Sequence, residues 1–162
     1  MSIGQSLLPE FDQETSTTRK VLERVPTEKG QWKPHPKSFP LGHLAQLVAG
    51  MPGWLPRMLM HAHLDLGMSS PYTFQPTKAL LEQFDRGVRD GRAALGAAED
   101  SSFDEPWALT HGDHVLFTMP RGVVVRQHFN HMVHHRAQLG VYLRLLDIPV
   151  PSMYGPTADE RM

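Results

Sequence analysis

Apolar residues recur at three- and four-residue steps in several stretches of the chain, which is the spacing of one face of an α-helix. The first such stretch runs from Leu7 to Val25 and ends at Pro26. Residues 27–40 contain three prolines, and repeated proline breaks regular structure. We therefore expect a first amphipathic helix over Leu7 to Val25, followed by an extended linker.

The pattern resumes after the linker, in residues 41–51. Ser38 is a suitable N-cap for this second helix, and Pro40 is suited to its first turn. Residues 52–53, a Pro-Gly pair, are expected to break or kink the helix, which then continues over residues 54–64.

Residues 67–75 are expected to form a loop, after which Thr77 would cap a third helix. The buried stripe of that helix is expected to consist of Leu80, Leu81, Phe84, Val88 and Leu95. The pattern then changes, because residues 107–119 read as two short strands around a Gly112-Asp113 turn. A small β-hairpin is the prediction for this segment.

The longest periodic stretch is Val123 to Leu146, which predicts a fourth helix that Pro120 opens and the prolines at 149 and 151 stop. The tail over residues 149–162 is expected to be extended and to lie against the helices through Val150, Met153 and Tyr154. Its acidic pair Asp159-Glu160 either folds back on the bundle, reaches a partner chain or is solvated. The whole pattern predicts a single all-α domain over residues 1–162, an up-and-down-type four-helix bundle with a long crossover and a hairpin before the last helix.

Composition limits the function classes. The formal net charge is −1 and the pI is about 6.8, so the overall charge gives no electrostatic reason to expect nucleic acid as a partner. No cysteine is present, which excludes disulfides and thiolate ligands. No stretch is apolar enough for a membrane span, and no leader-like segment is evident. A cytoplasmic protein with no membrane partner is expected.

Candidate chemistry lies on the fourth helix. His131 and His135 are four residues apart, so both imidazoles lie on one helical face and can share a metal ion. His128, Gln138 and Tyr142 fall on the same face and are candidates for substrate contacts or for support of the pair. Residues that lie off this stripe are His134, at its edge, and Arg136 and Arg144, for which solvent exposure or ion pairs are expected.

Histidines with this spacing also occur as a polar seam that is hydrogen-bonded to carbonyls or solvent. The apolar residues on both sides of the pair favour a metal, because a buried imidazole needs a partner. A zinc protease is not indicated, since Met132 stands where the HExxH motif requires a glutamate.

Residues 131–160, which begin HMVHHRAQLGVYLRLLD, closely resemble the DinB-like family of damage-inducible, metal-binding four-helix proteins. The resemblance extends to residues 35–45 (HPKSFPLGHLA), 52–54 and 106–107, and it covers most of the chain. It implies a four-helix bundle, often a homodimer. It also implies a divalent metal ion held by one histidine from the second helix and two from the HxxxH of the fourth.

By this resemblance the last two ligands map onto His131 and His135. Many relatives carry the remaining histidine where this chain has Leu47, four residues after His43. Either His43 supplies the ligand from one turn earlier, or it is a solvated residue and the site lacks its third histidine. His61 and His63 are further candidates.

The resemblance implies a metal-dependent enzyme with thiol-transferase or hydrolase chemistry on a small-molecule substrate, with Zn²⁺ or Ni²⁺ as the expected cofactor. The alternative is a non-catalytic dimeric bundle with a degenerate site from which the metal is absent. Such a protein would act as a binding or stress-response module.

Overall fold

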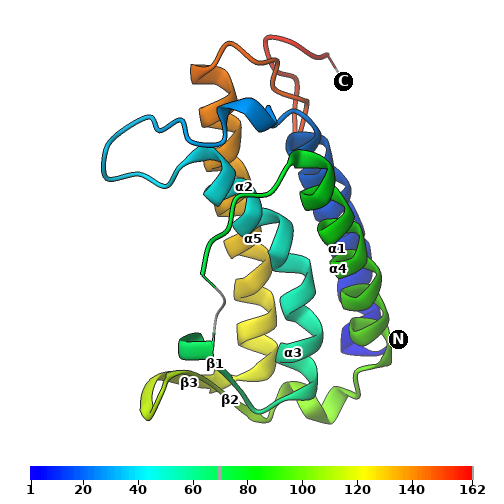
Figure 1. Cartoon of the computed structure of the whole chain (residues 1–162). Helices are drawn as coiled ribbons and strands as arrows, with labels where there is room; N and C mark the ends of the chain where they lie inside the picture. The colour runs from blue at the N-terminus through cyan, green and yellow to red at the C-terminus, as the bar shows by residue number, and fades with distance from the viewer. Residues whose placement is uncertain (69–70, 162) are drawn as a thin grey trace.

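The computed structural model describes residues 1–68 and 71–161, and this part of the chain is mostly helical with one small sheet. The helices are α1 (Ile3–Glu23), α2 (Leu41–Gly50), α3 (Trp54–Met60), α4 (Thr77–Ala97) and α5 (Arg121–Leu145). Short 3₁₀ turns are η1 (Thr27–Lys29), η2 (Met51–Gly53), η3 (Leu66–Met68) and η4 (Asp100–Phe103). Figure 1 shows the long helices running along one another, with the sheet at the end of the molecule that holds the N-terminus of α5.

The first two helices start at other residues than the predicted ones. α1 starts at Ile3, before the predicted Leu7, since Ser2 and Gln5 form a capping box there. α2 begins at Leu41 with Pro40 as its N-cap and no side-chain cap, so the predicted cap at Ser38 is wrong. The expected break at Pro52-Gly53 is confirmed as the 3₁₀ turn η2, which joins α2 to α3.

Thr77 is the first residue of α4, and the expectation that it caps this helix is also wrong. Its backbone N–H donates to Thr27 Oγ1 at 3.0 Å, and its own hydroxyl donates to the Val25 carbonyl at 2.7 Å. The hydroxyl that satisfies the helix end therefore comes from η1, fifty residues away in sequence. No local pattern in the sequence reports such a cap.

The predicted hairpin is confirmed as β2 (Pro106–His111) and β3 (His114–Pro120), which pair antiparallel around Gly112 at φ +57. A third strand, β1 (His63–Asp65), pairs parallel with β2 and was not predicted. The predicted continuation of helix over residues 54–64 is wrong at its end, because α3 stops at Met60 and the chain turns into this strand. Pairing with a distant strand outweighs the local helical pattern there.

α4 packs closely against η2 through two glycines. A Cβ placed on Gly87 would lie 2.7 Å from the backbone nitrogen of Gly53, and one on Gly91 would lie 2.8 Å from the Pro52 carbonyl oxygen. Only glycine permits this approach of backbone to backbone. In the predicted stripe of α4, Leu80, Phe84 and Leu95 are buried while Leu81 and Val88 are partly buried.

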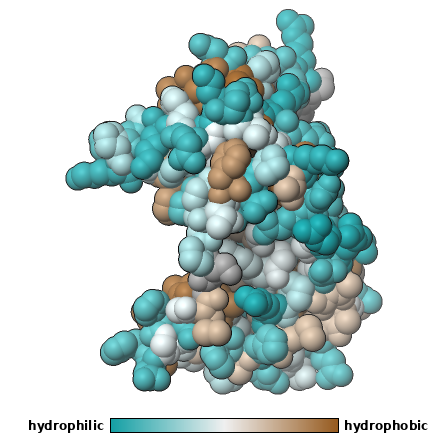
Figure 2. All heavy atoms as spheres, in the orientation of Figure 1, coloured by the Kyte–Doolittle hydropathy of each residue, from teal (hydrophilic) through white to brown (hydrophobic). Residues whose placement is uncertain are grey.

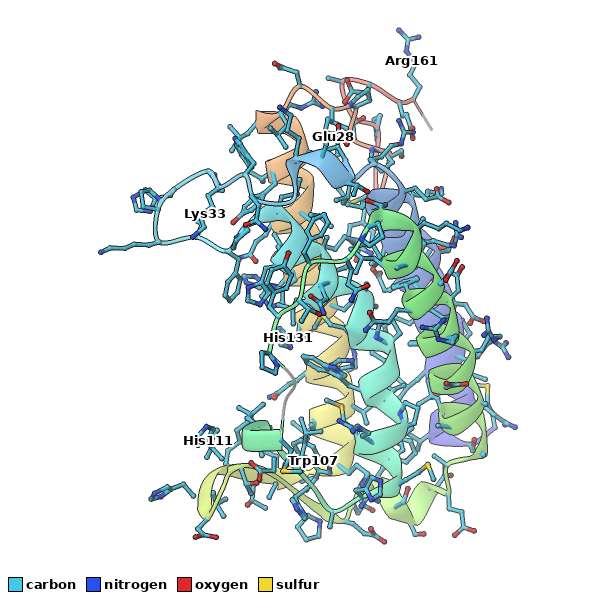
Figure 3. The ribbon with its side chains drawn as sticks, viewed as in Figure 1. Glu28, Lys33, Trp107, His111, His131 and Arg161 are labelled. Atoms are coloured by element: carbon cyan, nitrogen blue, oxygen red, sulfur yellow. The ribbon has the colours of Figure 1, made fainter. Side chains whose placement is uncertain are left out.

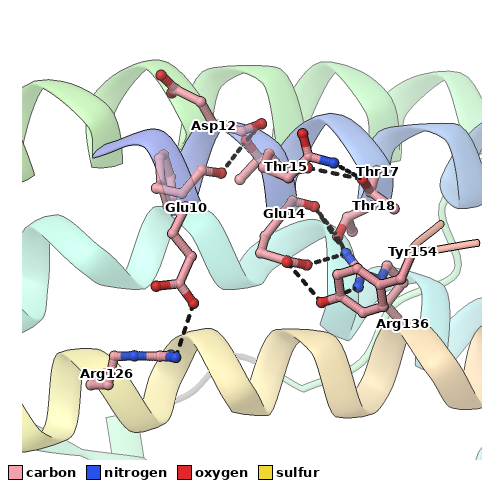
Figure 4. Close-up of polar contacts among 11 residues, drawn as sticks. Glu10, Asp12, Glu14, Thr15, Thr17, Thr18, Arg126, Arg136 and Tyr154 are labelled. Carbon is pink, nitrogen blue, oxygen red and sulfur yellow. Dashed lines mark hydrogen bonds and ion pairs between the residues drawn. The ribbon is translucent and has the colours of Figure 1, made fainter. Parts of the chain in front are cut away.

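The C-terminal tail folds back onto α1 and α5, as Figure 4 shows. Arg136, expected to face solvent or form an ion pair, is 1% exposed and pairs with the buried Glu14 of α1 at 2.6 Å. Tyr154 donates to Glu14 Oε1 at 2.7 Å and accepts from Arg136 Nη2 at 3.0 Å. Val150 is buried, whereas the ring of Tyr154, expected to pack against the helices, remains largely exposed beyond its bonded hydroxyl.

The acidic pair at the end of the tail takes the first of its expected alternatives and folds back on the helices. Asp159 pairs with Arg144 and Glu160 pairs with Arg24. Among the helices that the structure describes, none is both long enough and apolar enough to span a membrane.

Candidate functional site

His131 and His135 come together on α5. Their Nε2 atoms are 2.8 Å apart, a hydrogen-bonding distance, and their ring centroids are 4.6 Å apart. Figure 3 places His131 at the edge of the hollow that Figure 2 shows between the two ends of the molecule. The i, i+4 spacing on an unbroken helix explains the approach, because it sets both side chains on one face.

Gln138 determines the proton arrangement of the pair. Its Oε1 atom lies 2.8 Å from His135 Nδ1. Since this oxygen only accepts, Nδ1 donates to it, and Nε2 of His135 is left with its lone pair. Nε2 of His131 then donates to that lone pair. A histidine whose Nδ1 donates to an acceptor and whose Nε2 carries the lone pair has the arrangement of a typical metal ligand.

The pair lies among groups that disfavour a positive charge. Partial burial, together with the charges of His135 and His134, lowers the pKa of His131. His134 packs edge-on against His135 at 5.0 Å between ring centroids and is exposed. A neutral imidazole is available near neutral pH both to bind a cation and to accept a proton.

His128 and Tyr142, the other candidates on this face, contact protein groups. His128 is 4% exposed, and its Nε2 lies 2.9 Å from the Met51 carbonyl oxygen. Its burial lowers the pKa of its imidazole to about 4. The Tyr142 hydroxyl donates to the Phe39 carbonyl at 3.2 Å, and its ring packs edge-on against Trp32. Their predicted contacts with a substrate stay predictions.

His43 lies on α2, where its ring is stacked on that of Tyr72 and tilted against that of Phe39. Its centroid is 4.6 Å from that of Tyr72 and 4.4 Å from that of Phe39. Burial lowers its pKa. Leu47 and Trp54 line the same pocket as His43, and the ring centroid of Trp54 is 6.2 Å from that of His131.

A pocket of about 520 Å³ opens beside this row of side chains. His43, Leu47, Gly50 and Trp54 form one wall, at the four- and three-residue steps of a single helical face that continues through η2. Further side chains in the lining are Gln46, Arg57, Leu64, Asp65, Tyr72 and Gln83. The size is that of a small-molecule site.

Trp54, Arg57 and the two glutamines were not among the predicted site residues. The periodic spacing from His43 to Trp54 was a usable signal, but the Pro-Gly break between them concealed that the face is continuous. The contributions of Asp65, Tyr72 and Gln83 come from segments that only the folded chain brings together.

A third ligand for the pair is not formed by the side chains of residues 1–68 and 71–161. In these two ranges no three His, Cys, Asp or Glu residues are grouped so as to hold a metal ion. His61 and His63 are exposed, at the end of α3 and in β1. The donor set on α5 is therefore two imidazoles with one supporting amide.

Comparisons with known proteins identify the family of this chain. A model of the DinB family matches residues 1–161. The fold is similar to that of a DinB-like protein from Bacillus cereus ATCC 10987, with a TM-score of 0.68 at 20% identity, covering 93% of this chain and 97% of that one. It is also similar to the DinB-like protein YjoA from Bacillus subtilis, with a TM-score of 0.72 at 14% identity, covering 91% and 97%. No curated protein matches. The resemblance expected from the HHRAQL segment and its flanks is confirmed, and the chain belongs to the DinB family.

Proposed function

We propose that this chain binds Zn²⁺ or Ni²⁺ through His131 and His135 and acts as a metal-dependent transferase or hydrolase on a small molecule. The observation that carries the proposal is the 2.8 Å approach of the two Nε2 atoms, with Gln138 holding the far nitrogen of His135. Imidazole nitrogen is a ligand that both ions accept readily.

The two imidazoles fit a divalent ion with a small adjustment. Bonds of about 2.0–2.1 Å at a tetrahedral angle separate two ligand nitrogens by about 3.3 Å. The observed separation of 2.8 Å is shorter, so the rings would move apart by about half an ångström, and the proton on Nε2 of His131 would move to Nδ1 of the same ring. A bound ion of this kind lowers the pKa of a water or thiol ligand toward neutrality.

The chain's own residues do the remaining work. Gln138 keeps the proton of His135 on Nδ1, and the lowered pKa of His131 keeps that ring neutral near pH 7. Trp54 packs against His131 and also lines the pocket. A substrate seated in the pocket would reach the histidines past the indole.

Metal retention in the untagged protein tests the proposal. His131→Ala and His135→Ala are each expected to lose the metal, because each removes half of the protein ligands, and to cancel the rise in Tm that Zn²⁺ or Ni²⁺ produces by binding the native state. His134→Ala is the matched control, since it is adjacent and exposed but lies outside the bonded pair. Elemental analysis and thermal unfolding give the two readouts.

Loss of metal in His134→Ala alone would contradict the choice of helical face. Metal-free parent protein whose Tm is indifferent to both ions would exclude the metal-dependent enzyme. His43→Ala adds a further test, because unchanged affinity would remove His43 from the ligand set.

A second candidate is the non-catalytic binding module with a degenerate site. It is favoured by Leu47, which lines the pocket where relatives carry a histidine, and by the two-ligand donor set among the described residues. If this alternative is correct, the protein is folded without a metal, and its Tm does not change when Zn²⁺ or Ni²⁺ is added. For both candidate functions we propose that the protein is a four-helix bundle, that it forms a homodimer and that it is cytoplasmic. Light scattering tests whether it is a dimer. The bundle is supported by the packing of α1, α2 and α4 with α5 or with one another.

A further inference from the structure

We infer that the pocket beside α2 and α3 is a binding site for a small organic acid, whose carboxylate pairs with Arg57 and whose apolar body packs on Trp54. This inference names a substrate class for the proposed function, and it rests on that function only for the metal chemistry at His131. The binding of the acid itself is a separate property of the pocket. It depends on an unpaired cation and on a space left by a glycine beside two nitrogen donors.

Two buried polar atoms in the lining have no hydrogen-bond partner among the described residues. They are Oε1 of Gln46 and the hydroxyl oxygen of Tyr72. They come from α2 and from the segment before α4, and the Tyr72 hydroxyl lies against α2, where a Cβ on Gly42 would be 2.8 Å from it. Both oxygens are screened from solvent, so they become partners for a polar ligand only when their side chains turn toward the cavity.

Arg57 supplies the charge that selects an acid. It lines the pocket from α3, and no carboxylate of residues 1–68 or 71–161 forms an ion pair with it. Asp65 is the only acidic residue among the described residues of the lining, and its Oδ1 accepts from the backbone N–H groups of Gly67 and Gly112. Asp65 is thus tied to the two turns beside it, while the guanidinium of Arg57 remains available to a ligand.

Gly50 leaves the space in which the ligand lies. A Cβ built there would be 3.4 Å from Gln83 Nε2 and 3.9 Å from Trp54 Nε1. Two nitrogen donors therefore surround a position where any other residue would project a side chain. With Leu47, Leu64 and the indole as apolar walls, the pocket matches a molecule with an anionic end, an apolar middle and a hydrogen-bonding group.

Three probes of one shape and different charge test this inference, namely 4-phenylbutyrate, 4-phenylbutyramide and 4-phenylbutylamine. The acid is expected to bind with a Kd of about 1 mM or tighter, the range for about twelve non-hydrogen atoms. It should bind about tenfold more tightly than the amide or the amine. Calorimetry and ligand-observed NMR measure the three affinities at one fixed salt concentration.

Variants then assign the site. Arg57→Gln should lower the affinity for the acid to that for the amide. Arg86 is an exposed arginine on α4, and Arg86→Gln should leave all three affinities unchanged. Gly50→Leu fills the space beside residue 50 and should weaken the binding of both the acid and the amide by about tenfold or more. Tm values of the variants establish that each is folded, and the milder Gly50→Ala serves if the leucine variant is not.

His131→Ala separates this inference from the proposed function. It should abolish metal retention and leave the affinity for 4-phenylbutyrate unchanged. Equal binding of acid, amide and amine would overturn the inference, as would tighter binding of the amine or full affinity in Arg57→Gln. An acid that does not bind at all would overturn it too, whatever the metal content of the protein.

Discussion

Leu47 stands where the family resemblance leads us to expect a third histidine. It lines the pocket between His43 and Trp54, on the face that leads to His131. Leu47→His is expected to raise the affinity for Zn²⁺ or Ni²⁺ by about tenfold or more, a free-energy gain of about 1.4 kcal/mol, because a third imidazole joins the pair. Competition titration against a chelator measures the change. Ser16→His, on the exposed side of α1, is the control, and equal affinities in the two variants would show that α2 does not reach the ion.

His128 makes stability depend on pH. Its pKa is about 4 in the folded protein, against an ordinary value of 6.5. Below about pH 6.5 the imidazole is therefore protonated in the unfolded chain, whereas in the folded chain it stays neutral until about pH 4. Stability is therefore lost as the pH falls through this window, by about 2 kcal/mol between about pH 7 and pH 4.5.

His128→Gln tests this dependence, since glutamine keeps a donor for the Met51 carbonyl but does not titrate. Urea unfolding at about pH 7 and pH 4.5 measures the free energy of unfolding. Its decrease between the two pH values should be smaller in the variant than in the parent, by about 2 kcal/mol. Carboxylates with lowered pKa values, such as Asp85, also lose stability in acid, and the difference between variant and parent cancels them. Parallel losses in the two proteins would contradict the assignment to His128.

At the scale of elements, the contact between α4 and η2 positions α3 and hence Trp54. Gly87→Ala is expected to cost about 1–3 kcal/mol, because the new Cβ would lie 2.7 Å from the Gly53 nitrogen and force the two backbones apart. Gly96→Ala, on the exposed side of the same helix with its nearest neighbour at 3.7 Å, should instead stabilise by about 0.5–1 kcal/mol. Denaturant midpoints compare the two. A stable Gly87→Ala would mean that the close approach is unimportant.

At the scale of the whole molecule, the tail joins α1 to α5. A chain ending at Ile148 loses the Tyr154 hydroxyl from the Glu14–Arg136 pair and uncovers the core beneath Val150. Because a buried pair depends on its remaining hydrogen bonds, Tm is expected to fall by about 5 °C or more. Thermal unfolding monitored by circular dichroism measures it. Arg161→Ala, exposed at the end of the tail, should leave Tm unchanged, and an unaltered Tm in the shortened chain would contradict a structural role for the tail.

The long helices and the hairpin were predictable because their signals are local. Periodic apolar positions mark α1, α4 and α5, and the Gly-Asp turn marks β2 and β3. The same local rule predicted that His131 and His135 share a face, and their rings are in contact. What local rules missed was β1, whose pairing with β2 joins residues more than forty positions apart.

By itself the sequence determined the helical periodicity, the family and the pairing of two histidines one turn apart, since each depends on residues close together in the chain. Tertiary structure alone decided the burial of Arg136 against Glu14, the stacking of His43 on Tyr72 and the pocket between Arg57 and Gln83. Each of these depends on which segments meet in space. That is set by the packing of the whole chain, because burial and the pairing of charges are properties of the assembled core and not of any single segment.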